Sequence, residues 1–120
     1  MAEPIGSRAI TAGLAERQFL SSEVWPDHPC CVVVFRDEII QKYPEAVQEF
    51  TTMLVESGLY IRDHVDEAAE IAVAFLDPGK KIGLEPGLLR NVLSDPQGIT
   101  TDNLYPVKED LETIQDYMTT

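Results

Sequence analysis

Three polar residues near the amino terminus have the side chains needed to contact a small ligand. Glu3, Ser7 and Arg8 surround the start of a short helix expected from Ile5 to Glu16. Backbone N–H groups at a helix start carry partial positive charge and attract anionic groups. We therefore predict Glu3, Ser7 and Arg8 as ligand-binding residues. The structural alternative is a chain terminus that frays in solvent.

The two cysteines of the chain, Cys30 and Cys31, are adjacent and open an apolar run that ends at Phe35. Neighbouring residues of a strand point to opposite faces, so a bond between these two would require a strained local ring. His28 is close in sequence, but a fourth metal ligand is missing. We predict buried thiols that serve in packing, and no metal site.

The other reactive side chains favour structural roles. Trp25 lies in a proline-bounded loop and is expected to clamp that loop onto the core, although stacking on a ligand is the alternative. His64 ends a long helix, where a cation suits the negative end of the dipole. Lys80 and Lys81 lack the glycine spacing of a phosphate-binding loop, which indicates a solvated loop. No nucleophile–base pair is evident, so we predict a non-enzymatic protein without a cofactor.

Net charge restricts the partners. The chain carries 9 basic and 21 acidic residues, a formal charge of −12. Nucleic acids and anionic membranes bind mainly through Lys and Arg, so both are excluded as expected partners. A small anion is not excluded, because one helix start or one Arg can bind it locally. The chain has neither an apolar membrane span nor a signal peptide at Met1, so a complete chain of this sequence would be cytoplasmic.

Hydrophobic periodicity indicates that helices position these residues. The longest apolar stripe, from Pro44 to His64, includes Gly58, where a missing side chain would let another backbone approach closely. Asp66 is expected to cap the next helix. The predicted helices are Ile5 to Glu16, Arg36 to Lys42, Pro44 to His64, Glu67 to Leu76, a helix opening near Pro86 and ending at Ser94, and a last one after Pro106.

One segment predicts a strand. Cys30 to Phe35 is continuously apolar and rich in β-branched residues, which is typical of a strand buried on both faces; Gln18 to Ser21 is a second, weaker candidate. We therefore assign the fold class α/β, helix-rich, with four or five helices and one or two strands. Such a sheet is not stable alone, so the missing strands belong to other sequence or to a second copy. We expect the isolated chain to be a homo-oligomer, joined through this strand or by exchanged helices.

The ordered set of motifs resembles the carboxy-terminal part of the solute-binding proteins of nitrate/sulfonate/taurine/bicarbonate ABC importers, a family that includes binders of thiamine-pyrimidine precursors. Its members show an aromatic-or-Glu-Pro element, a "CVLVV" strand, an "NPE.V..F" helix and an "N.EEAA" helix in this order. The corresponding segments here are residues 3–9, 25–34, 43–50 and 65–72.

The resemblance implies a fragment of a type II periplasmic binding protein, with residues 1–120 forming a single partial domain that matches the last third. It implies binding of a small anion or small organic solute without chemistry, an ABC permease as partner, and a periplasmic or extracytoplasmic location for the full-length parent. It also places Glu3 near the ligand cleft. Two alternatives stay open, namely a cytoplasmic ligand sensor or interaction module on the same fold, and an unrelated small helical domain.

Overall fold

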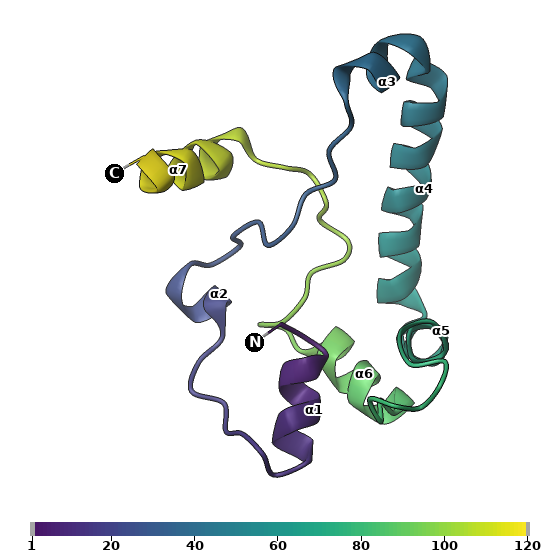
Figure 1. The fold of residues 1–120 in the computed structure, drawn as a ribbon, viewed down its shortest axis with the longest axis vertical. Coiled ribbons are helices and arrows are strands. Elements are labelled where there is room, and N and C mark those ends of the chain that lie inside the picture. Colours follow the sequence, from purple (N-terminus) through teal and green to yellow (C-terminus); the bar gives the residue numbers. More distant parts are fainter. Residues whose placement is uncertain (1, 120) are drawn as a thin grey trace.

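The computed structural model describes residues 2–119, which form seven helices joined by irregular segments (Figure 1). Prolines occupy the first positions of two of them, where a missing N–H costs nothing. The helices are α1 (Ile5–Thr11), α2 (Ser21–Val24), α3 (Asp37–Lys42), α4 (Pro44–Asp63), α5 (Val65–Leu76), α6 (Pro86–Ser94) and α7 (Lys108–Thr119).

The predicted α/β class is wrong for the described chain. Residues 2–119 contain no strand, and more helices form than the four or five expected. The segment from Cys30 to Phe35 forms neither helix nor strand, and no neighbouring segment pairs with it. Its apolar, β-branched pattern satisfies the local preference for a strand, but a strand exists only as part of a hydrogen-bonded ladder. The second candidate, Gln18 to Ser21, leads directly into α2.

The helical predictions agree better with the structure. The helices α3, α4 and α6 lie within one residue of the predicted bounds. The first helix is shorter than expected and is followed by Gly13 in a left-handed conformation (φ 70°). Asp66 does not cap α5, because the cap position belongs to His64 and Asp66 lies in the first turn. There its carboxylate still suits the positive end of the helix dipole.

The core lies between α5 and α6. Ala69 on α5 packs with Leu84 and Leu89, and all three are buried. Small alanines on α5 let α6 approach closely, and the two helices cross in contact at the base of the molecule (Figure 1). This pair supports both α1, which contacts α6, and α4, which contacts α5.

Gly58 is the buried residue of α4, as its place on the apolar stripe predicts. A Cβ built on Gly58 would overlap the carbonyl oxygen of Thr101, so the backbone of the segment after α6 lies directly against α4. The close backbone approach predicted at Gly58 is confirmed. Near the other end of α4, Phe50 meets Phe35 edge to face, with ring centroids 5.4 Å apart. That contact anchors the end of the Cys30 to Phe35 segment on α4.

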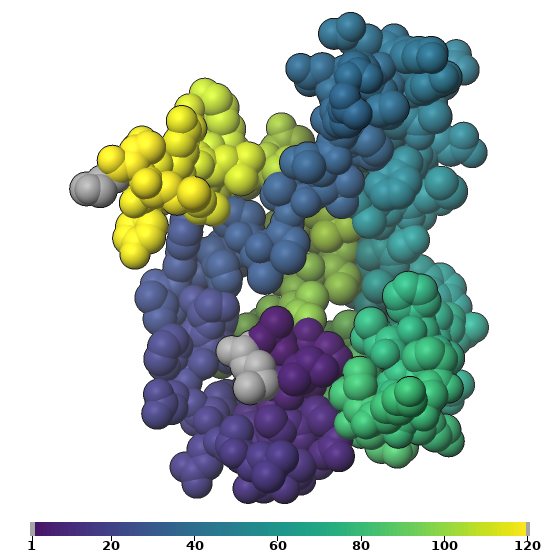
Figure 2. All heavy atoms as spheres, viewed as in Figure 1, coloured from purple at the N-terminus to yellow at the C-terminus, as the bar shows by residue number. Residues whose placement is uncertain are grey.

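The chain is open rather than tightly packed. Its radius of gyration is 16.7 Å, compared with about 14 Å for a compact domain of this length. Its accessible surface is 9678 Å², about 3,000 Å² more than folded monomers of this mass expose. Figure 2 shows α7 projecting from the body, and on it Tyr117 and Met118 are 86% and 79% exposed. Much apolar surface is therefore uncovered.

The cysteine prediction is also wrong. Cys30 and Cys31 are free thiols and both are exposed, because no sheet covers the segment that carries them.

The helices of the described residues include none with the length and the hydrophobicity of a membrane-spanning segment.

Candidate ligand site

A cavity of about 340 Å³ lies between α1 and α6. At this place α1 contacts α6, near the base of the molecule (Figure 1). Its walls come from α1, from the segment that leads to α2, from α6 and from the turn after α6. The lining residues are Glu3, Ser7, Ile10, Thr11, Arg17, Leu20, Leu88, Asn91, Val92, Asp95 and Gly98.

Two of the three predicted ligand residues line this cavity. Glu3 and Ser7 are also linked to each other, because the Glu3 carboxylate (Oε2) accepts a hydrogen bond from the Ser7 N–H at 3.1 Å. One turn further along α1, the Thr11 hydroxyl donates to the Ser7 carbonyl oxygen at 2.9 Å. The start of α1 is therefore held in place, and both predicted side chains are half-buried rather than frayed.

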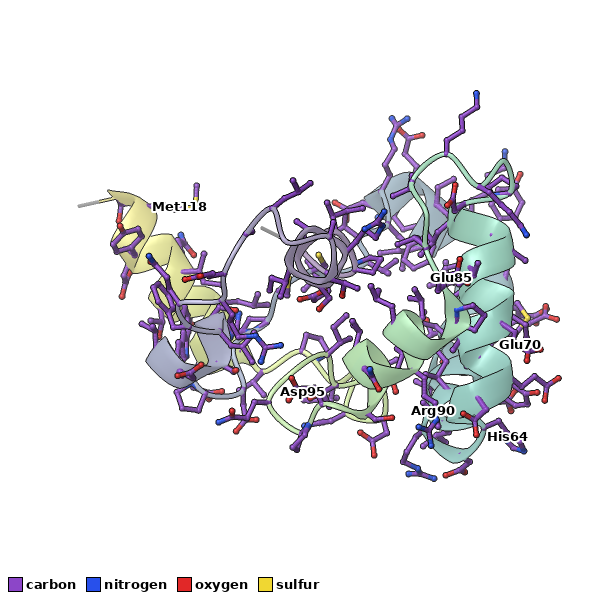
Figure 3. All side chains as sticks on the ribbon, turned by 90° about the horizontal axis from the view of Figure 1, so that it is seen from below. His64, Glu70, Glu85, Arg90, Asp95 and Met118 are labelled. Carbon is purple, nitrogen blue, oxygen red and sulfur yellow. The ribbon has the colours of Figure 1, made fainter. Side chains whose placement is uncertain are left out.

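The opposite wall is fixed by Asp95, which Figure 3 places at the end of α6. Its carboxylate pairs with Arg17 at 3.4 Å and accepts the N–H of Gln97 at 3.0 Å. The Ser22 hydroxyl donates to the Gln97 carbonyl oxygen at 2.6 Å. These contacts tie α2 and the segment before it to the turn after α6 and close one side of the cavity.

Arg8 faces another part of the molecule. Its Nε donates to the Ile82 carbonyl oxygen at 3.1 Å, and the nearest guanidinium nitrogen lies 3.0 Å from the position that a Cβ on Gly83 would take. The structure therefore separates Arg8 from Glu3 and Ser7: it links α1 to the loop between α5 and α6 and does not line the cavity.

That loop is organised by Asp77, which is 4% exposed. Its two carboxylate oxygens accept four backbone N–H groups at 2.7–3.1 Å, from residues 81–84. Burial raises the pKa of Asp77, but the four hydrogen bonds together outweigh this effect and lower the pKa from its ordinary value. Lys80 and Lys81 belong to this loop, and both are exposed as the solvated-loop interpretation requires.

Trp25, His28 and His64 do not line the cavity. The Nδ1 atom of His28 is 2.8 Å from the Trp25 carbonyl oxygen. The ring centroids of His28 and Trp25 are 6.1 Å apart. The His64 ring stacks on Tyr60 with centroids 4.3 Å apart, where α4 meets α5. No cluster of three potential metal ligands occurs within residues 2–119.

The cavity combines apolar walls with a few polar groups, as small-molecule sites do. The lining includes two carboxylates, Glu3 and Asp95, and one guanidinium, Arg17, while Ser7 and Asn91 supply neutral donors and acceptors. The local charge is therefore negative overall. Such a lining can hold an ammonium group against a carboxylate and orient a neutral or zwitterionic solute by hydrogen bonds.

Comparison with known families gives one match. The model of the NMT1-like family matches residues 1–76, more than half of the chain and the whole stretch from α1 to α5. The chain belongs to the NMT1-like family. This family is part of the nitrate/sulfonate/taurine ABC solute-binding proteins, so the resemblance in the motif order is confirmed. Neither the curated proteins nor the solved structures contain a match.

The region matched by the NMT1-like family includes only part of the cavity lining. Glu3 and Ser7 lie within the matched region, whereas Asn91 and Asp95 lie beyond residue 76. Arg17 falls inside the match but in no recognisable motif. These last three are brought to the cavity only by the packing of α1 on α6, for which the sequence carries no local signal.

Proposed function

We propose that this chain is part of the substrate-binding component of an ABC importer and that the cavity between α1 and α6 contacts the transported solute. The observation that carries the proposal is that Glu3 and Ser7, both within the family-matched region, line one cavity together with polar groups of α6 and of the turn after it. The solute is bound without chemistry. The full-length protein works outside the cytoplasm, delivering the solute to an ABC permease.

The lining favours a small zwitterion over a bare anion. Arg17 already forms an ion pair with Asp95 at 3.4 Å, which leaves little positive charge to bind a ligand that carries only an anionic group. An amino group can instead approach Glu3 while an acidic group approaches Arg17. A cavity of about 340 Å³ is at the small end of the range for ligand sites, which begins near ~300 Å³. Taurine, an aminosulfonate, is therefore the first ligand to test, and nitrate is the comparison.

Replacing Ser7 with alanine should weaken taurine binding about five- to tenfold, since one hydrogen bond is worth about 1 kcal/mol. Titration calorimetry on the 120-residue chain measures this change. Ser57→Ala is the matched control, because Ser57 is also a helical serine but lies on the exposed side of α4. Equal taurine affinity in the Ser7 variant and the wild type, or tighter binding of nitrate than of taurine, would count against the proposed site.

We also infer that the isolated chain self-associates by exchanging α7. The excess surface of about 3,000 Å² is larger than the ~800 Å² that each partner buries in a standard interface. The apolar residues Leu111, Ile114 and Met118 recur at helical spacing on α7. Met118 lies far from the α5–α6 pair (Figure 3). A second copy can cover this face by swapping the helix.

Met118→Glu should therefore shift the chain towards monomer, because it places a charge on the apolar face of α7. Thr113→Glu adds the same charge on the opposite side of α7, two residues from Leu111 and five from Met118, and should leave the association unchanged. Sedimentation equilibrium at micromolar concentration distinguishes the two. A wild-type chain that is already a folded monomer would contradict the inference.

A further inference from the structure

The two cysteines form a surface feature that is independent of the cavity. Cys30 and Cys31 are both exposed, and their sulfur atoms are 3.9 Å apart, with the Cys31 thiol donating to Cys30. Neither residue lines the cavity between α1 and α6. Side chains at adjacent positions of a regular strand would point to opposite faces; here both thiols point to a common space because the segment is not in a sheet.

The sulfur separation suits a single bridging atom better than a disulfide. A disulfide needs the sulfurs at about 2.05 Å, so Cys30 and Cys31 would have to approach strongly and close a strained ring. Two sulfur ligands of a tetrahedral centre with bonds of about 2.3 Å lie about 3.8 Å apart, and a pyramidal centre such as trivalent arsenic holds them somewhat closer. From the observed 3.9 Å, the two sulfurs need a much smaller approach to bind one such atom than to form a disulfide.

The surrounding backbone leaves the pair free to adjust. None of the backbone–backbone hydrogen bonds within residues 2–119 involves residues 26–35, so a small change at Cys30 or Cys31 breaks no ladder. The hydrogen bond from Cys31, its charge and partial burial raise the pKa of Cys30. Cys30 is therefore mainly a protonated thiol near neutral pH.

We propose that Cys30 and Cys31 form a dithiol site for trivalent arsenic, a soft centre that two thiols from one protein can hold. With an aryl arsenoxide, two S–H bonds break and two As–S bonds form. The two protons leave with the arsenoxide oxygen as one water molecule, and no oxidant or reductant is needed. Zn²⁺ should not compete, because it requires four ligands and the described chain offers no third group at this position.

The experiment uses the reduced 120-residue chain and one equivalent of phenylarsine oxide. We expect intact mass to rise by one phenylarsine oxide minus one water, and both thiols to be lost to a thiol-reactive dye. Addition of 2,3-dimercaptopropanol should restore them. Cys30→Ser and Cys31→Ser each replace an exposed side chain and keep the other thiol, so both variants should fold. Each should bind phenylarsine oxide at least about 100-fold more weakly, because the effective concentration of the second thiol is lost.

Three results would overturn the proposal. The first is a wild-type chain that keeps both dye-reactive thiols in the presence of one equivalent of phenylarsine oxide. The second is a serine variant that binds it as tightly as the wild type. The third is protection of both thiols by Zn²⁺ at the same concentration, which would indicate further ligands and a different site.

Discussion

Replacing Gly58 with alanine is expected to destabilise the chain by about 2–3 kcal/mol. The sign is unusual, because the same change inside an exposed helix normally stabilises by up to ~1 kcal/mol. At this position the new Cβ would overlap the Thr101 carbonyl oxygen and lie 3.1 Å from a methyl carbon of Leu104. A backbone carbonyl cannot rotate out of the way, so the segment that follows α6 would have to leave α4.

Gly87 provides the matched control for this substitution. It is also a helical glycine, in the first turn of α6, but a Cβ there would meet nothing within 4 Å. Gly87→Ala should therefore leave stability unchanged or raise it slightly. Urea unfolding followed by circular dichroism measures both variants. If Gly58→Ala were as stable as Gly87→Ala, the close contact between α4 and Thr101 would not exist in solution.

The helices could be predicted from the sequence because their signals are local. Pro44 and Pro86 mark the first turns of α4 and α6, and the apolar stripe of α4 predicts the close approach at Gly58. A stripe and a proline act within a few residues of the backbone that they shape. Such signals therefore predict a helix independently of how the rest of the chain folds.

Whether Cys30 to Phe35 forms a strand could not be predicted from such local signals. Cys30 to Phe35 has the composition of a buried strand, but pairing needs a partner segment, and residues 2–119 supply none. The predicted burial of Cys30 and Cys31 followed from the same assumption and fails with it. Burial of a strand residue is a property of the complete sheet, not of the strand's own sequence.

The sequence predicts only those lining residues of the candidate site that lie close together along the chain. Glu3 and Ser7 lie one helical turn apart, so the sequence alone places them together. Arg8 is their neighbour in sequence, but it points towards the Ile82 carbonyl oxygen. The opposite wall, from Leu88 to Gly98, belongs to α6 and the turn after it, and only the packing of α1 on α6 brings it there.

Asp77 is predicted to be the most sensitive polar residue of the chain. The sequence indicates only a helix stop at this position, yet its carboxylate binds four backbone N–H groups, from residues 81–84. Asp77→Ala leaves these donors without their acceptor in a poorly solvated loop. We expect the melting temperature to fall by about 10 °C or more, and the link between Arg8 and Ile82 to be lost with the loop. Thermal unfolding by circular dichroism measures the change.

Asp77→Asn is the sharper variant, because it preserves the shape of the side chain. An amide has one acceptor oxygen, and its NH₂ group would face N–H donors. Two of the four hydrogen bonds are therefore replaced by donor–donor contacts, and the asparagine variant should lose nearly as much thermal stability as the alanine variant. An asparagine variant that melts with the wild type would show that the carboxylate does not organise the loop.

The contribution of Asp77 should also depend on pH in a defined direction. Its folded-state pKa is lowered below the ordinary value of 3.8 by the four hydrogen bonds, which outweigh the opposing effect of burial. The folded state therefore binds the proton more weakly than the unfolded state does, so the stabilisation is complete above the unfolded pKa and is lost as the pH falls through the folded pKa. The difference in melting temperature between the wild type and Asp77→Asn should be constant from about pH 5 to 7 and should narrow below pH 3.8. A difference that stays the same down to pH 2 would mean that the ionised carboxylate is not what the loop binds.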